Sequence, residues 1–95
     1  MSWKFLDPPN VAVITHRQIM KGEEWIAYVS HDDDDGCWQF LGPGDAREED
    51  ASIVGLKEIF DLDNSIGELA DLPEGWHAWR EAPSAPWRRG KTDWR

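Results

Sequence analysis

Residues 69–80 read Leu-Ala-Asp-Leu-Pro-Glu-Gly-Trp-His-Ala-Trp-Arg, and this stretch decides the fold. It predicts the end of a helix, a Pro-Glu-Gly stop signal and then a short strand, because proline and glycine end helices. Successive side chains of a strand point to opposite faces of a sheet. The two faces therefore receive different residues: Trp76, Ala78 and Arg80 on one, His77 and Trp79 on the other.

Hydrophobic periodicity before this stretch predicts the other elements. Ser65 with Glu68 three residues later predicts a capping box at a helix start, and Asp35-Gly36 predicts a hairpin turn. The expected strands cover residues 10–16, 24–31, 37–41 and 75–80, and the expected helices cover residues 51–61 and 66–72. The order β-β-β-α-α-β predicts an α+β fold, a small antiparallel sheet of about four strands with two short helices on one side.

The chain has 95 residues, which fit one domain with an extension at each end. We expect an N-terminal arm over residues 1–9, a single α+β domain over residues 10–81, and a Pro/Trp/Arg-rich tail over residues 82–95. Three interpretations of the tail stay open. It is partly disordered, it docks Trp87 on the domain, or it binds an acidic surface such as that of another copy.

Seven tryptophans compensate for a short supply of other large apolar side chains. Each buries roughly 150–250 Å² when it fills a core, whereas an exposed tryptophan often marks a partner-binding surface. We expect Trp38 and Trp76 in the core. Trp79, on the other face of its strand, is the best candidate for exposure, and Arg80 beside it predicts a cation–π contact.

The charge is strongly negative and uneven. The net charge is −9, but residues 1–81 hold 18 acidic and 6 basic side chains, whereas residues 82–95 are net basic. An acidic domain repels phosphates, so nucleic-acid binding is not expected. The charge favours encounter with a basic partner protein, although a surface that resists aggregation explains it equally well.

Cysteine usage and hydropathy predict the compartment. The single cysteine, Cys37, excludes an internal disulfide framework and fits a reducing environment. The N-terminal residues lack the apolar segment of a signal peptide, and no apolar run reaches transmembrane length. We therefore expect a cytoplasmic protein with no membrane partner.

No metal-binding motif is complete. The four aspartates at 32–35 followed by Gly36 resemble part of a calcium loop, but alignment on Gly36 leaves Gly42 where the bidentate glutamate belongs. A solvated acidic turn is the expected structure. The three histidines lack zinc-motif spacing, although His16 and His31 are expected to end neighbouring strands, which would bring them close. We expect neither a metal nor a cofactor.

Catalytic motifs are missing as well. Cys37 follows four aspartates, which should raise the pKa of its thiol, and only His31 across the hairpin is a candidate base. The serines lack the setting of a nucleophile elbow, and no glycine-rich phosphate loop precedes a helix. We expect no catalytic residues and no enzymatic activity.

Four segments carry a family resemblance: Trp38-Gln39-Phe40-Leu41, Asp50-Ala51-Ser52-Ile53-Val54, Asp63-Asn64-Ser65-Ile66 and Leu72-Pro73-Glu74-Gly75-Trp76-His77-Ala78-Trp79-Arg80. With these segments the chain resembles, from about Val11 to Arg80, a small bacterial family of formerly unknown function. That family is grouped with the immunity proteins of polymorphic toxin systems as immunity protein family thirty-three. The resemblance implies a non-enzymatic α+β protein that neutralises a toxin. The basic tail lies outside the resemblance.

These observations lead to one hypothesis and one alternative. The hypothesis is a cytoplasmic, immunity-like protein that occludes a basic toxin with an acidic and aromatic surface. The residues expected to bind the partner are Asp32, Asp33, Asp34, Asp35, Glu48, Glu49, Asp50 and Trp79. The alternative is a stand-alone domain that binds a small ligand or forms a homodimer.

Overall fold

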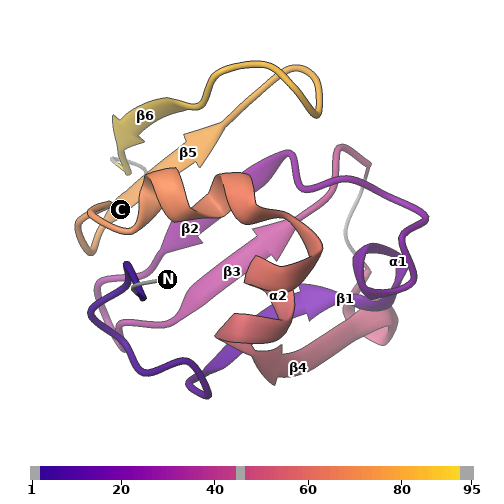
Figure 1. Cartoon of the computed structure of the whole chain (residues 1–95), viewed down its shortest axis with the longest axis horizontal. Helices are drawn as coiled ribbons and strands as arrows, with labels where there is room; N and C mark the ends of the chain where they lie inside the picture. The colour runs from indigo at the N-terminus through magenta and orange to yellow at the C-terminus, as the bar shows by residue number, and fades with distance from the viewer. Residues whose placement is uncertain (1–2, 45–46, 93–95) are drawn as a thin grey trace.

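The computed structural model describes residues 3–44 and 47–92 of the chain. Within them, six strands form one sheet against which short helices lie (Figure 1). The strands are β1 (Ala12–His16), β2 (Tyr28–His31), β3 (Trp38–Leu41), β4 (Ala51–Gly55), β5 (Trp76–Trp79) and β6 (Arg88–Lys91). The helices are α1 (Arg17–Met20) and α2 (Leu56–Leu62), with the 3-10 segments η1 (Glu48–Asp50) and η2 (Asn64–Leu69). The predicted α+β class is confirmed.

The strands are not arranged in sequence order. Their order across the sheet is β4-β1-β3-β2-β5-β6, and β1 runs parallel to β3 with Ile14 opposite Gln39. The other pairs are antiparallel, so the sheet is mixed and not purely antiparallel as predicted. Because β3 separates β1 from β2, His16 and His31 end strands that are not neighbours, and they lie at opposite ends of the sheet.

The sheet has six strands, and the prediction of about four was wrong. The first missed strand is β4, which occupies residues predicted as a loop and a helix start. Apolar side chains from Ile53 onward fit helical spacing, but Gly55 has an extended backbone and α2 begins only at Leu56. Residues 51–55 pair along their whole length with β1. β4 places an exposed Ile53 next to a half-buried Val54, so its sequence lacks the apolar–polar alternation typical of a half-buried strand, and this hid β4 in the sequence.

The second missed strand, β6, lies in the tail. It reads Arg-Arg-Gly-Lys, so no apolar pattern marks it as a strand. It pairs antiparallel with β5, with Trp79 opposite Arg88 and Trp76 opposite Lys91. Basic side chains suit an edge strand because they discourage pairing with another chain. Part of the predicted tail therefore extends the sheet.

The helices are shorter than predicted. The helix expected over residues 51–61 is α2, and Glu58 Oε2 accepts a hydrogen bond from the Gly55 N–H at its start, at 2.8 Å. The helix expected over residues 66–72 is the 3-10 segment η2. The predicted capping box of Ser65 and Glu68 is absent. Asp63 caps η2 instead, accepting from the Ser65 N–H at 3.0 Å.

α2 and η2 cover one face of the sheet (Figure 1). The hydrophobic core lies between these two helices and the sheet. Trp38 is 2% exposed in this core and Trp76 packs against it, as predicted. The N-terminal arm joins them, because Phe5 stacks edge-on against Trp38 with ring centres 5.4 Å apart. Asp7 Oδ2 accepts a hydrogen bond from Trp38 Nε1 at 2.8 Å. The arm thus covers the largest buried side chain.

Arg80 is the most deeply buried charge on this covered face, and its side chain is 1% exposed. It donates hydrogen bonds to the Ile26 carbonyl oxygen at 2.8 Å, to Ser65 Oγ at 2.9 Å and to Asp63 Oδ2 at 2.6 Å. Burial alone raises the pKa of Asp63, but the hydrogen bonds from Ser65 and Arg80 outweigh it, and the pKa is lowered. Buried charge is tolerated here because it is paired and hydrogen-bonded.

Trp87 completes this group. Its ring lies 4.2 Å from the Arg80 guanidinium carbon, and the Trp25 ring lies 6.0 Å away. The predicted contact between Arg80 and Trp79 is wrong, because the two residues point to opposite faces of the sheet. Of the three interpretations of the tail, the docking of Trp87 is the one observed, since Trp87 packs against the core.

Candidate functional site

The face of the sheet opposite α2 and η2 carries neither of them, and we call it the open face (Figure 1). Strand registers place one row of side chains across it, from β4 to β6. The row consists of Ile53, Ile14, Gln39, Ser30, His77 and Gly90. Ile53 at its β4 end is 75% exposed, so a large aliphatic side chain of the row lies in solvent. The row is apolar at one end and polar in the middle.

An aromatic cluster occupies the β5 end of the open face. Tyr28 Oη and His77 Nδ1 share a hydrogen bond of 2.9 Å, and the rings of His77 and Trp79 lie 5.1 Å apart. A Cβ at Gly90 would touch both the His77 and the Trp79 rings at 3.4 Å, an ordinary contact distance, so both rings lie over β6. Trp79 is half-buried on the face predicted for it.

The surroundings of Tyr28 favour the protonated, uncharged form of its phenol. Burial raises the pKa of the Tyr28 phenol, and the nearby charge of Asp32 raises it further. The phenol therefore holds its proton at neutral pH and remains available to donate. A cluster of aromatic rings with polar edges is the kind of surface on which protein partners dock.

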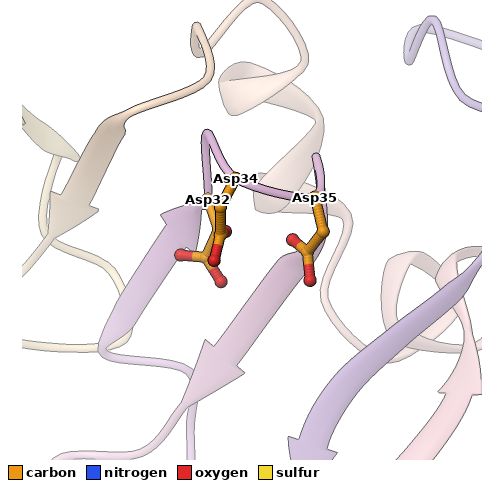
Figure 2. A group of neighbouring side chains, drawn as sticks. All are labelled: Asp32, Asp34 and Asp35. Atoms are coloured by element: carbon orange, nitrogen blue, oxygen red, sulfur yellow. The ribbon is translucent and has the colours of Figure 1, made fainter.

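The aspartate turn lies between β2 and β3. The carboxylates of Asp32, Asp34 and Asp35 come within 4.8 Å of one another, and Figure 2 shows the three side chains hanging from the turn on the same side. Asp35 Oδ1 accepts a hydrogen bond from the Cys37 N–H at 2.9 Å, inside the turn. Asp34 and Asp35 are exposed, as predicted for a solvated turn. The absence of a metal there stays a prediction.

Asp32 differs from its neighbours because it contacts the open face. Its Oδ2 accepts a hydrogen bond from Gln39 Nε2 at 2.8 Å, and its Oδ1 accepts one from Ser30 Oγ at 3.3 Å. Gln39 and Ser30 belong to the row across the sheet. The aspartate turn therefore borders the open face at one end of the strands.

A polar pocket of about 370 Å³ lies at the opposite end of the strands. It is lined by His16, Arg17, Gln18, Glu24, Arg47, Glu49 and Asp50. The Asp50 side chain is only 12% exposed, and it accepts from Arg17 at 2.9 Å and from Gln18 Nε2 at 3.0 Å. Of the lining residues, Glu49 and Asp50 belonged to the predicted surface. Gln18 and Glu24 were missed, since nothing in their sequence context links them to Asp50.

A second pocket, of about 270 Å³, joins the polar pocket to the open face. It shares His16 and Arg47 with the polar pocket and adds Ile14, Gln39 and Glu48, among others. Glu48 and Ile14 therefore line one hollow. The acidic η1 segment borders the open face at the end opposite Asp32.

The predicted partner-binding residues thus fall into three groups. The aspartates at 32–35 lie at one end of the sheet, η1 lies at the other, and Trp79 lies on the open face between β2 and β6. The structure does not gather them into one cluster. It arranges them around the open face, which sequence reasoning identified only through Trp79.

The Cys37 thiol and the His31 ring, the candidate nucleophile and base, are each engaged with other groups. Burial raises the pKa of Cys37, and the charges of Asp35 and Asp32 raise it further, as the sequence predicted. His31 stacks on Trp38 with ring centres 3.9 Å apart and donates from Nδ1 to the Leu72 carbonyl oxygen at 2.7 Å. The His31 ring faces the core, where Trp38 and the Leu72 carbonyl engage it. A thiol kept protonated is a poor nucleophile.

Comparison with known proteins adds no assignment: no family model, no curated protein and no solved structure matches the chain. In the part of the chain that the structure describes, no helix has the length and apolar character needed to cross a membrane.

Proposed function

We propose that this chain is a non-enzymatic, cytoplasmic protein of the immunity type, which neutralises a basic toxin by binding to it and blocking its active surface. The observation that carries the proposal is the open face. It is a sheet surface of aromatic and aliphatic side chains with carboxylates at both ends, Asp32 at one and Glu48 at the other. Aromatic side chains supply binding energy, and the flanking charges steer a basic partner onto them.

Two properties of the open face support this proposal: its rings are already ordered, and carboxylates lie at its rim. Tyr28, His77 and Trp79 are held in place by mutual contacts before any partner arrives, so little ordering is needed on binding. The carboxylates at the rim are exposed or half-exposed, where they accelerate association more than they add affinity. The family resemblance of the sequence points in the same direction.

Growth rescue tests the proposal. The tagged chain is used to capture proteins from its native lysate at low and moderate salt, and each captured protein is expressed alone and together with this chain. We expect a basic protein that is lost as salt rises, that arrests growth when expressed alone and that is neutralised by co-expression. A captured protein that is harmless alone, or that stays toxic in the presence of this chain, contradicts the proposal.

Self-association is the second candidate function, and Ile53 favours it. This side chain is 75% exposed on β4, which is an edge strand of the sheet that residues 3–44 and 47–92 form. Edge strands of this kind can pair with another copy. Light scattering after gel filtration measures the oligomeric state and so tests self-association. A dimer that becomes monomeric on Ile53→Lys supports self-association. A wild-type chain that stays monomeric at high concentration excludes it.

A further inference from the structure

Two acidic side chains at opposite ends of the open face form no ion pair with any residue in 3–44 and 47–92. Asp32 accepts hydrogen bonds from two neutral side chains, and Glu48 pairs with no lysine or arginine. Arg47 lines the same pocket as Glu48, but it pairs with Glu49 at 3.4 Å. The two acidic ends can therefore each take a cation from outside the chain.

The surface between the two acidic ends is largely apolar. Ile14 and Leu41 line the pocket of about 270 Å³ beside Glu48. Ile53 lies next to Ile14 across the pairing of β4 with β1, and Tyr28 lies next to Leu41 across the pairing of β2 with β3. We call these four side chains the apolar patch. It extends over β4, β1, β3 and β2, which are neighbours in the sheet.

We propose that the open face binds an amphipathic α-helix of the partner, with an apolar stripe on the apolar patch and a basic side chain near each end. This inference rests on the proposed function, because it names the element through which a basic toxin engages the open face. The carboxylates at the two ends supply the charge complementarity, and the patch supplies the apolar area.

A helix suits a sheet face better than an extended segment does. The N–H and C=O groups of an extended segment laid on this face would be buried without partners, whereas a helix bonds its own. Folded proteins cover apolar sheet faces with helices or with a second sheet. A second copy of this chain could supply a sheet, but it would bring the same net charge of −9 to an acidic face.

The distance between the two acidic ends sets the length of the helix. Asp32 is level with Cys37, because the Cys37 carbonyl oxygen accepts its N–H at 2.9 Å. η1, which contains Glu48, precedes Ala51, and the strand registers place Ala51 level with Leu41. The strand from residue 37 to residue 41 is about 13 Å long, at about 3.3 Å per residue. A helix of about three turns, or about 16 Å, spans this length and brings its first and last turns beside the carboxylates.

A designed peptide tests the proposal without the natural partner. The probe is a capped peptide of about 14 residues, with leucines along one side of the helix, lysines in its first and last turns, and alanine and glutamine elsewhere. Titrated into the whole chain, it should give saturating nitrogen-15 NMR shifts of the Gln39 and Leu41 amides and the Trp79 indole. We expect a dissociation constant of about 100 μM or tighter and a gain of helical circular dichroism on binding.

A control peptide separates recognition from attraction by charge. It has the same composition and the same terminal lysines, but its leucines are spread around the helix. We expect it to bind at least about tenfold more weakly, because it presents no apolar stripe. Equal binding of the two peptides would show that charge alone attracts them, and binding without a gain of helix would exclude the helical form. Either result overturns the proposal.

A matched pair of variants locates the contact. Ile53→Lys places a charge on the apolar patch, and Leu62→Lys makes the same change of charge at the end of α2, away from the open face. Both side chains are exposed, 75% and 49%, so both variants should fold. We expect Ile53→Lys to bind the leucine-striped peptide about tenfold more weakly than Leu62→Lys does. Equal affinity of the two variants would remove the open face as the binding site.

The outcomes separate this inference from the proposed function. A chain that binds the striped peptide on the open face but neutralises no toxin keeps the helix-binding site and loses the function. A chain that neutralises a toxin but does not bind the striped peptide keeps the function and loses the helix-binding site.

Discussion

The side chains on the two faces of the sheet are fixed by different kinds of contact. On the covered face, Arg80 depends on groups from distant parts of the chain: the Ile26 carbonyl, Asp63 and Ser65 near η2, and Trp87 in the tail. On the open face, Tyr28, His77 and Trp79 contact one another and need no helix above them. The covered face therefore holds the fold together, and the open face can change without unfolding it.

This difference gives an ordered set of tests. Substitutions on the covered face should reduce stability, and substitutions on the open face should reduce partner binding. The largest effects are expected where distant segments converge, and the smallest where a side chain lies in solvent.

Arg80→Met should have the largest effect. It removes three hydrogen bonds and leaves Asp63 without its charged partner, and breaking a buried pair in this way costs about 3–5 kcal/mol. Urea unfolding followed by tryptophan fluorescence measures the loss. The matched control is Arg88→Met, whose pair with Glu81 is exposed at both ends and should matter little. Equal losses in the two variants would show that the Arg80 group does not hold the covered face.

Acid should weaken the same group. The folded-state pKa of Asp63 is lowered, so its contribution is present above the unfolded pKa of about 3.9 and is lost as the pH falls through the folded value. We expect the urea midpoint to fall below about pH 4 in the wild type and to fall less steeply in Asp63→Asn. The pKa of Asp71 is also lowered, by its hydrogen bond and ion pair with Arg89, but this pair is exposed and screened by solvent, so Asp71→Asn should change the acid profile much less than Asp63→Asn does. An identical profile for Asp63→Asn would contradict the assignment.

Trp79 and Trp76 allow a comparison of the faces on one strand. Trp79→Ala should cost only about 1–2 kcal/mol of stability, because the ring is half-buried, yet should weaken partner binding at least about tenfold. Trp76→Ala, on the core side, should cost more stability and leave the affinity of the folded fraction nearly unchanged. Calorimetric titration and urea unfolding measure the two quantities. The reverse pattern would place the partner on the covered face.

The smallest effect on stability is expected at Asp34. Asp34→Asn alters an exposed turn and should change the free energy of unfolding by less than about 0.5 kcal/mol. It should slow association with a basic partner a few-fold at low salt, and the difference should vanish at high salt. Stopped-flow measurements at two salt concentrations test both statements. An unchanged rate at low salt would remove the aspartate turn from the interface.

Sequence reasoning recovered the parts of the fold whose side chains alternate between core and solvent. β5 is the best example, since Ala78 is buried and Trp79 lies on the other face, as its pattern requires. β4 and β6 escaped because edge strands are specified by backbone pairing, which leaves no apolar signature in Arg88–Lys91.

The candidate site was predictable only in part, for a related reason. The acidic residues of η1 and of the aspartate turn were identified by charge, and Trp79 by strand alternation. The polar pocket could not be anticipated, because Gln18 and Asp50 meet through the pairing of β1 with β4, and β4 was not recognised. A missed strand therefore hid the pocket beside it.

The order of strands across the sheet constrains the order in which the chain can acquire its structure. The first half of the chain contributes β1, β2 and β3, which become the middle of the sheet, while both flanks, β4 on one side and β5 with β6 on the other, come from the second half. During synthesis, the β1 edge of these three early strands stays unpaired until β4 has emerged from the ribosome, and the β2 edge stays unpaired until β5 has emerged. The nascent chain thus passes through a stage with two unpaired strand edges, and β6, rich in arginine and lysine, is added last and forms the final edge beside β5.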